Sequence, residues 1–444
     1  MSSRRGYALA RDTFTSFDRR CSVESSVQRP DRYRSLEQLP ADALCIPRGG
    51  GVSYVGASFA ADAISQDMSA FDRLLEFDPE RGLLRVEAGA HIADVMRFVL
   101  AHGWSLPVAP GHPQASIGGC VAADVHGKNP ARDGTFRDQV DALQVLDSNR
   151  AWQQLSARNP ADQIQFAAQF AGFGIPGLIT SVSLRLQPAA KAYSVRRLPV
   201  RNLIEAAEVL RAHASAPLLY GWHDGRSSRF GRGVIRFGLE SHDTPAHRRQ
   251  RPDLPASIAP GRFTLWSRAG IAAANTLLGQ RWCRPGSSTL SPLQAMFPLN
   301  GARGYFAGFG RDGMVEAQWL LPHGDYAGFV QELEKLVQRL QPCISLISSK
   351  LFSGRPEGFA FDGEGIALSM QFPAPDTPSQ RDFLRALTEL AIAHHGRPNL
   401  IKDSSLDAEQ VRRAMPDFES ARATLRHFDP QELRQSALTR RLQL

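Results

Sequence analysis

The stretch that decides the fold is Gly118-Gly119-Cys120-Val121-Ala122-Ala123-Asp124-Val125-His126-Gly127-Lys128-Asn129. Its paired glycines let the backbone approach a ligand closely, and the small side chains after them leave a space that a packed core would fill. A lone histidine is more often structural than functional, but a buried lysine next to it needs a partner. The stretch therefore predicts one wall of a binding site for a flat or phosphorylated ligand.

A second glycine-rich segment lies about seventy residues upstream, at Pro47-Arg48-Gly49-Gly50-Gly51-Val52-Ser53-Tyr54-Val55-Gly56. Successive backbone N–H groups in glycine-permitted conformations form a nest for an anion, and Arg48 adds positive charge there. Taken alone, this segment fits a hairpin loop between two strands equally well. Taken together, the two segments predict one extended ligand held between them, with Tyr54 pointing into the site.

A third segment, Gly172-Phe173-Gly174-Ile175-Pro176-Gly177, matches the GxGxxG pattern of dinucleotide-binding folds. That fingerprint follows a strand and opens a helix. Here a helix-like segment precedes it and a β-branched run at residues 178–186 follows it. We therefore expect a turn that approaches the ligand from another side, and no Rossmann fold.

Composition limits the class of protein. The 444 residues are enough for two or three domains, and 43% hydrophobic with 22% charged residues is typical of a folded globular chain. The net charge of +8 comes from scattered arginines, which is weak support for anionic partners and argues against a nucleic-acid surface. No run of eighteen apolar residues predicts a spanning helix, and residues 266–282 fit either a buried helix or contact with a membrane surface.

The cysteines show no paired spacing and no accompanying histidine pattern. This arrangement predicts neither a disulfide framework nor a zinc site, and it fits a reducing cytoplasm. The five residues are Cys21, Cys45, Cys120, Cys283 and Cys343.

Periodicity separates an N-terminal unit from the rest. Residues 83–103 switch from strand alternation to helical spacing and end at Gly103, a typical residue after a helix. A helix near residues 162–170 and a strong strand at 178–186 follow, up to a boundary at Pro188.

Beyond Pro188 the pattern predicts an antiparallel sheet covered on one side by two amphipathic helices, at residues 326–340 and 379–395. The least regular part is 241–291, where we expect loops. The expected strands are 218–223, 234–237, 315–321 and 366–372. The fold class predicted is α+β.

Two of these strands each carry a polar face. Glu316 and Gln318 alternate with apolar residues, and Ala367, Ser369 and Gln371 share one face of the later strand. In an ordinary sheet such a face meets water, and the pattern alone favours this interpretation over a face turned toward a bound ligand.

In order and spacing, the glycine-rich segments resemble the flavin-binding domain of the vanillyl-alcohol-oxidase superfamily. Within it, the chain is most similar to the decaprenylphosphoryl-β-D-ribose 2-oxidase family, from about residue 35 to the C-terminal region. The specific matches are His126-Gly127-Lys128-Asn129 and Lys402-Asp403-Ser404. Further matching motifs are Arg48-Gly49-x-Gly51-x-Ser53-Tyr54, Pro110-Gly111 with Gly118-Gly119, Trp222-His223-Asp224, Gln318 and Lys350-Leu351-Phe352.

The resemblance implies a PCMH-type FAD-binding domain of two subdomains at residues 1–190 and a substrate-binding domain at 191–395. Residues 396–444 are then a C-terminal segment that returns to the FAD-binding domain. It implies non-covalent FAD, because the histidine that some relatives use for covalent attachment does not occur between residues 47 and 59. The residues expected to contact FAD are Arg48, Gly49, Gly50, Gly51, Val52, Ser53, Tyr54, Pro110, Gly111, Ser116, Gly118, Gly119, Ala122, Ala123, Val125, His126, Gly127, Asn129, Gly174, Gly177, Ile179 and Lys402.

The resemblance also assigns catalytic and substrate-binding residues. Lys402 and Tyr54 are the implied catalytic residues, with Lys402 stabilising charge at the flavin and orienting the substrate hydroxyl. Alternatively, Lys402 is an exposed lysine before a helix that residues 403–405 cap. The implied substrate-binding residues are His126, Trp222, Glu316, Gln318, Lys350, Phe352 and Ser369.

Three positions depart from the family pattern. Ser369 and Ala367 stand where a cysteine and an asparagine are expected, and Glu316 stands where a glutamine is expected. These departures make cofactor binding better supported than the identity of the substrate.

The implied function is oxidation of a secondary alcohol of a sugar or lipid-linked sugar to a ketone by hydride transfer to FAD. An NAD-dependent reductase as partner would complete an epimerase pair. The alternatives are a sugar-lactone or alditol oxidase that uses oxygen, and a non-catalytic flavin-binding partner protein. We expect a cytoplasmic protein, at most in peripheral contact with the inner face of the membrane, with no metal and no nucleic-acid partner.

Overall fold

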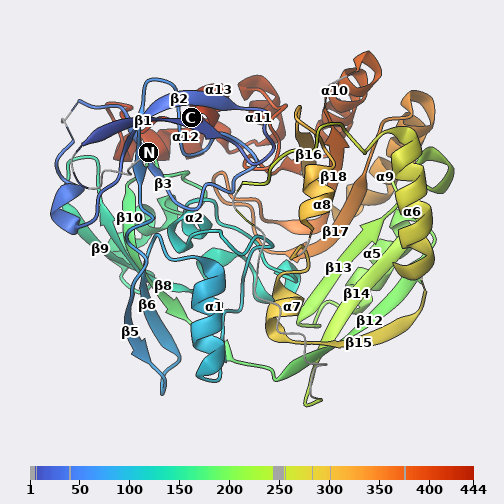
Figure 1. The fold of residues 1–444 in the computed structure, drawn as a ribbon, viewed down its shortest axis with the longest axis horizontal. Helices are drawn as coiled ribbons and strands as arrows, with labels where there is room; N and C mark the ends of the chain where they lie inside the picture. The colour runs from blue at the N-terminus through green and yellow to red at the C-terminus, as the bar shows by residue number, and fades with distance from the viewer. Residues whose placement is uncertain are drawn as a thin grey trace.

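The computed structural model describes residues 6, 8–39, 42–243, 255, 257–282, 284–300, 302–374 and 377–444. Figure 1 shows two bodies side by side. One holds the N-terminal strands together with the C-terminal helices, and the other is built on a large sheet from the middle of the chain.

The first body contains two sheets. The smaller has the strand order β1-β2-β4-β3, with β1 Leu9–Thr15, β2 Ser22–Gln28, β3 Cys45–Arg48 and β4 Ile64–Asp67. Because β3 and β4 pair in parallel, the glycine-rich segment that follows β3 is part of a crossover connection. The hairpin alternative for this segment is therefore wrong.

The second sheet of this body is antiparallel and has the order β5-β6-β10-β8-β9. Helix α1 (Ile92–Ala101) follows β6, and Gly103 after it has a φ of 80°, as the helix-ending glycine requires. The strands are β5 Leu74–Asp78, β6 Leu83–Glu87, β8 Val140–Leu146, β9 Trp152–Ser156 and β10 Leu178–Arg185. The turn at 172–177 precedes β10, which confirms that it does not open a helix.

The second body is an eight-stranded antiparallel sheet of order β15-β12-β14-β13-β17-β18-β16-β19. Apolar residues of one face form a common core with helices α5 (Leu203–Ala212), α9 (His323–Leu340) and α10 (Pro378–Ala393). The strands are β12 Ala192–Val200, β13 Leu218–His223, β14 Gly233–Ser241, β15 Gly286–Leu290, β16 Met314–Pro322, β17 Leu346–Ser353, β18 Glu364–Pro373 and β19 Arg397–Pro398. The α+β class and the helix-covered antiparallel sheet are confirmed, while β12, β17 and α5 were not predicted.

Shorter elements complete the chain. They are β7 Trp104–Ser105, β11 Gln187–Pro188, α2 Ile117–Ala122, α3 Pro130–Asp133, α4 Gln163–Ala168, α6 Arg268–Trp282, α7 Pro292–Met296, α8 Arg303–Ala307, α11 Ala408–Ala414, α12 Phe418–Phe428 and α13 Ala437–Leu442. Helix α6 confirms the helix expected within 266–282, while strand β15 lies in a part of 241–291 where loops were expected. Residues 244–254, 256 and 283, and with them Cys283, lie outside the described residues. Among the helices that the structure describes, none is long and apolar enough to cross a membrane.

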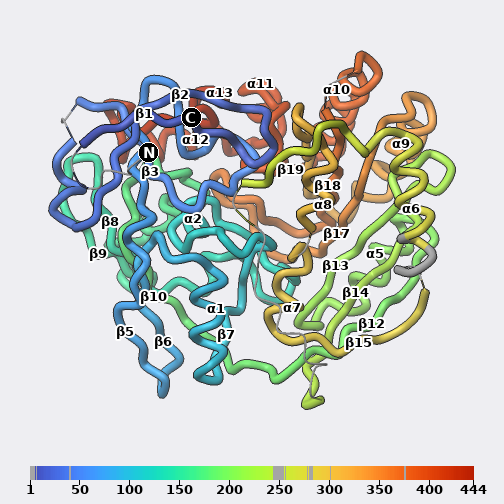
Figure 2. Tube along the Cα trace, viewed as in Figure 1, coloured from blue at the N-terminus to red at the C-terminus, as the bar shows by residue number. Residues whose placement is uncertain are grey.

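The C-terminal segment runs back along the first body, as the red trace beside the blue strands in Figure 2 shows. The backbone N–H of Cys45 donates to the carbonyl of Leu433 at 2.8 Å. The N–H of Leu438 donates to the carbonyl of Gly56 at 3.0 Å. These contacts support the proposed return of residues 396–444 to the first domain.

Candidate active site

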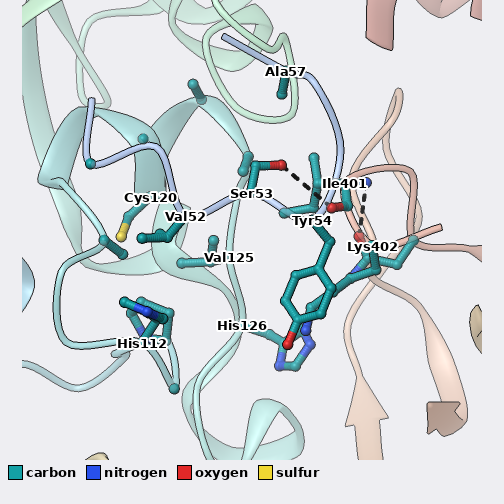
Figure 3. A pocket seen from close by; sticks show the side chains of 18 of the residues that line it. Val52, Ser53, Tyr54, Ala57, His112, Cys120, Val125, His126, Ile401 and Lys402 are labelled. Carbon is teal, nitrogen blue, oxygen red and sulfur yellow. Dashed lines mark hydrogen bonds between the residues drawn. The ribbon is translucent and has the colours of Figure 1, made fainter. Parts of the chain in front are cut away.

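A cavity of about 350 Å³ lies where the two bodies meet. Its walls come from the glycine-rich loops of the first body, from the polar faces of β16, β17 and β18, and from the segment Asn399, Ile401 and Lys402. Figure 3 shows Tyr54, His126 and Lys402 gathered on one side of it and Val52, Cys120 and His112 on another. The polar strand faces thus turn toward a cavity.

Only glycine fits where the two predicted loops touch. A Cβ at Gly49 would lie 1.9 Å from the Oγ of Ser116, and a Cβ at Gly50 would lie 2.0 Å from the carbonyl oxygen of Gln114. The same Ser116 Oγ accepts hydrogen bonds from the N–H groups of Gly50 and Gly119, both at 3.2 Å. Ser116 therefore ties the two loops together at the start of α2, and a side chain at either glycine would separate them.

Nearly all of the residues expected to contact FAD line the cavity. Gly127 and Asn129 are not among the lining residues. The side chain of Asn129 donates to the carbonyls of Ala214 and Ala216, each at 2.6 Å, so it joins the two bodies. The lining residues from the predicted set are Arg48, Gly49, Gly50, Gly51, Val52, Ser53, Tyr54, Pro110, Gly111, Ser116, Gly118, Gly119, Ala122, Ala123, Val125, His126, Gly174, Gly177, Ile179 and Lys402.

Arg48 lines the cavity, but its guanidinium is already engaged. It donates to the Oγ of Ser58 at 2.8 Å and lies 4.6 Å above the centre of the Phe14 ring. It also lies against Gly51, where a Cβ would be 2.3 Å from its terminal nitrogen. Arg48 thus supports the glycine-rich loop from beneath.

A buried ion pair lies at the centre of the site. The Nζ of Lys402 is 3.0 Å from the Oε1 of Glu316, whose side chain is only 3% exposed. The same carboxylate accepts from the Oγ of Ser369 at 2.6 Å and from the Nε2 of Gln371 at 2.7 Å. Lys402 also lies 4.2 Å above the ring centre of Tyr54. Two of the three departures from the family pattern, Glu316 and Ser369, therefore contact each other.

The electrostatics of this cluster favour a charged carboxylate. Burial by itself raises the pKa of Glu316, but the Lys402 ammonium and the Ser369 and Gln371 donors outweigh it, and the pKa falls below the ordinary 4.5. Burial, reinforced by the Glu316 charge, raises the pKa of Tyr54 well above 10. Tyr54 is accordingly a neutral phenol, which can donate a hydrogen bond.

A second network surrounds His126. The side-chain amide of Asn399 donates to the Oε1 of Gln318 at 2.9 Å, which leaves the Nε2 of Gln318 as a donor to the Nε2 of His126 at 3.4 Å. On the other ring nitrogen, the Nζ of Lys350 lies 3.1 Å from Nδ1 and donates to the carbonyl of Gly127 at 2.7 Å. With Gln318 donating to Nε2, the ring proton lies on Nδ1, which faces the carbonyl of Gly127 at 3.3 Å and the Nζ of Lys350. In its neutral form, the Lys350 amine can accept this proton.

The lysines near this network favour the same protonation states. Burial, followed by the charges of Lys128 and Lys402, lowers the pKa of Lys350 well below 10.5. Burial and then the Lys402 charge lower the pKa of Lys128 to about 7. The cavity is lined by three lysines, Lys128, Lys350 and Lys402. Among the described residues, only Lys402 of these three pairs with a carboxylate.

The predicted substrate-binding residues His126, Trp222, Glu316, Gln318, Lys350 and Ser369 line the cavity, but Phe352 does not. Phe352 is fully buried among Leu320, Phe361 and Ala367 and contacts the His126 ring edge-on at 5.2 Å. Its predicted role as a cavity wall is corrected: Phe361 covers it, and it supports His126 from behind.

Several lining residues were missed. Four of the polar or aromatic ones among them are His112, Tyr220, Ser348 and Asn399. Alternation would have found two of them, because Tyr220 and Ser348 lie two residues before Trp222 and Lys350 on the same strand faces. His112 and Asn399 lie in loops, where no periodicity points to them.

The capping alternative for Lys402 is wrong. Asp407 is the N-cap of α11 and accepts from the N–H of Gln410 at 2.9 Å. The carboxylate of Asp403 instead accepts from the N–H and Oγ of Ser405. The described part of the chain contains no cluster of metal-ligating side chains, and its four cysteines are free.

Comparison with known proteins agrees with this geometry. Residues 41–155 match a family model described as an FAD binding domain. The chain is 27% identical over 417 residues to the decaprenylphosphoryl-β-D-ribose oxidase of Mycolicibacterium smegmatis, covering 90% of this chain and 89% of the relative. The chain is an FAD-dependent oxidoreductase. It is also 22% identical to an alditol oxidase of a Streptomyces species, over 91% of this chain and 92% of that protein.

The residues of this oxidoreductase fit FAD. The matched range contains both glycine-rich loops, whose contact leaves no room for a Cβ at Gly49 or Gly50. Gly111 borders the cavity, and a Cβ there would meet only side-chain atoms of Leu299 and Lys128, at 3.8 and 3.9 Å, so the backbone is open to a ligand there. That the FAD is held without a covalent bond stays a prediction.

Proposed function

We propose that the protein oxidises a secondary alcohol of a sugar or lipid-linked sugar to a ketone. The observation that supports this most is the Lys402–Glu316 pair, which contacts Tyr54 of the first glycine-rich loop and lines one cavity with both loops. Bound FAD supplies the two-electron oxidation by accepting a hydride from the carbinol carbon. The protein's own task is then to orient the alcohol and to move its hydroxyl proton.

In this proposal Lys402 orients the substrate. Its ammonium, held by Glu316 at 3.0 Å, donates to the hydroxyl oxygen that becomes the ketone. Glu316 and Ser369 offer an acceptor and a hydroxyl for neighbouring hydroxyl groups of a polyhydroxylated substrate. Tyr220 and Trp222 provide aromatic surface on β13.

The proton acceptor must be an unprotonated base, and Lys402 is paired as an ammonium. We assign this role to His126 with Lys350. The Nε2 of His126 takes the hydroxyl proton while its Nδ1 proton passes to the Lys350 amine, 3.1 Å away. Because the imidazole gains one proton at Nε2 and loses another from Nδ1 in the same step, it stays neutral. The lowered pKa of His126 therefore does not prevent it from serving as the proton acceptor.

A second candidate, an alditol oxidase that uses oxygen, has one specific observation in its favour. The buried carboxylate of Glu316 replaces a neutral side chain expected in the phosphoryl-ribose oxidases, and a carboxylate is a good acceptor for polyol hydroxyls. The overall similarity to an alditol oxidase extends over nearly the whole chain.

The test is anaerobic reduction of the bound flavin by a panel of polyols, sugar lactones and prenyl-phosphoryl pentoses. Bleaching by the prenyl-phosphoryl pentoses alone supports the lipid-linked sugar. Bleaching by free polyols, with hydrogen peroxide formed on readmission of air, supports the alditol oxidase. A flavin that none of them bleaches contradicts both.

The partner and the location also remain proposals. If the substrate is a lipid-linked sugar, the ketone requires an NAD-dependent reductase to complete an epimerisation, and the enzyme would contact the cytoplasmic face of the membrane peripherally. Co-purification of a reductase activity that consumes the ketone product tests this.

A further inference from the structure

A second cavity, of about 540 Å³, opens on the other side of the loops that carry Tyr54 and Lys402. It lies where α10, α11 and α13 come together with the turn at Arg20 and Cys21. Figure 1 shows these three helices near one another at the top of the view. Its volume is within the range of small-molecule sites, about 300–1,000 Å³.

The charges of its lining are all of one sign. The lining contains four arginines, and among the described residues it contains no aspartate or glutamate. The four are Arg20, Arg381, Arg385 and Arg441. The side-chain amide of Gln410 adds a neutral polar group to the wall. The hydroxyls of Thr388 and Ser405 also line it but donate to the Leu384 carbonyl and the Asp403 carboxylate, and Ser404 bonds to Asp18. Guanidinium groups recognise phosphate oxygens because the planar fork matches them two at a time.

The carboxylates nearby are outside this lining and have other contacts. Asp382 lies 3.5 Å from Arg385 as an exposed pair, which contributes little in water. Asp18 accepts from the N–H of Arg20 at 2.9 Å and from the Oγ of Ser16. Asp403 is engaged with Ser405. Their charges reduce the positive field of the cavity but leave its surface without an anionic side chain.

One guanidinium is already positioned. The Nη2 of Arg441 donates to the carbonyl of Asp403 at 2.9 Å, which fixes the side chain against the loop behind Lys402. Its Nε is buried and has no acceptor within the described part of the chain. A positioned guanidinium with an unused donor binds an anion at a smaller entropic cost than a mobile surface arginine.

We propose that this cavity is a second ligand site, which binds a soluble phosphate-bearing anion. A single small ion would leave most of 540 Å³ empty, so the ligand carries at least two phosphate groups or one phosphate on a small organic body. The site is separate from the substrate cavity but shares its wall. Val55 and Gly56 follow Tyr54 in the chain, and Ser404 and Ser405 follow Lys402.

The experiment is calorimetric titration of the FAD-loaded enzyme with inorganic pyrophosphate. The variant is Arg381→Gln with Arg385→Gln, two exposed residues on α10 that line only this cavity. The control is Lys335→Gln with Arg339→Gln on α9, which removes the same charge from exposed positions outside both cavities. Citrate, an anion of similar charge without phosphate, is titrated in parallel.

The expected result is saturable binding of one pyrophosphate per chain, weakened at least about tenfold in the α10 variant and unchanged in the α9 control. Citrate should bind at least about tenfold more weakly than pyrophosphate. Equal weakening in both variants would show a general charge effect and overturn the proposal. Equal binding of citrate, or no saturable binding by the wild-type enzyme, would overturn it as well.

Discussion

Replacing Glu316 with glutamine tests the central ion pair. At 3.0 Å and an effective dielectric constant of about 20, the Coulomb attraction is about 5.5 kcal/mol. Because the Lys402 side chain is 27% exposed and glutamine keeps one acceptor oxygen, we expect a net loss of about 2–3 kcal/mol. If the pair orients the substrate in the transition state, this corresponds to about 30- to 150-fold slower flavin reduction.

The assay is anaerobic stopped-flow bleaching of the bound flavin by whichever substrate reduces the wild-type enzyme. Glu334→Gln on the exposed surface of α9 is the matched control, since it makes the same chemical change away from the cavity. Its rate should equal that of the wild type. A Glu316→Gln enzyme that retains FAD and bleaches at the wild-type rate would refute the reasoning.

Three further predictions follow from the site. Lys402→Met should retain FAD and lose at least about a hundredfold in the rate of bleaching; full bleaching would exclude its role. Gly50→Ala should purify with much less FAD than the wild type because its Cβ meets a backbone carbonyl at 2.0 Å, while Gly324→Ala, with open space around it, should keep a normal flavin content. Lys128→Met should stabilise the flavin-free protein, since a pKa lowered from 10.5 to about 7 means that the unfolded chain binds more protons between these values. The free energy of unfolding of the wild type should therefore rise with pH across this window. In urea unfolding, the free energy of unfolding of Lys128→Met should exceed that of the wild type by roughly 4 kcal/mol at pH 7 and by roughly 2 kcal/mol at pH 9. A constant advantage would contradict the buried titration.

The sequence pointed to one wall of the cavity because the signal there is local. Gly49 and Gly50 leave no room for a Cβ against Ser116 and Gln114, and Gly118 leaves none against Ala88, and such glycine pairs are visible in a single sequence. The alternation in β16 and β18 likewise predicted that Glu316 and Ser369 lie on the polar faces of these strands. In the structure the two side chains contact each other.

What the sequence did not reveal depends on contacts between distant segments. The Lys402–Glu316 pair joins residues 86 positions apart, and no periodicity links them. The motif predicts that Asn129 contacts the ligand. Its side-chain amide instead donates to the carbonyls of Ala214 and Ala216 in the second body. Phe352 continues the face of Lys350 by alternation, but Phe361 from a following loop covers it. Strand β17 itself was missed because serines interrupt its apolar pattern.

The most direct test of the account is the deuterium isotope effect on flavin bleaching with a substrate labelled at the carbinol carbon. The proposed oxidation breaks this C–H bond in the step that reduces the flavin, so the rate should fall severalfold on deuteration in the wild type. The effect should persist, at a lower absolute rate, in Glu316→Gln. Bleaching at the same rate with labelled and unlabelled substrate, under single-turnover conditions with saturating substrate, would contradict oxidation of the alcohol carbon as the chemistry of this site.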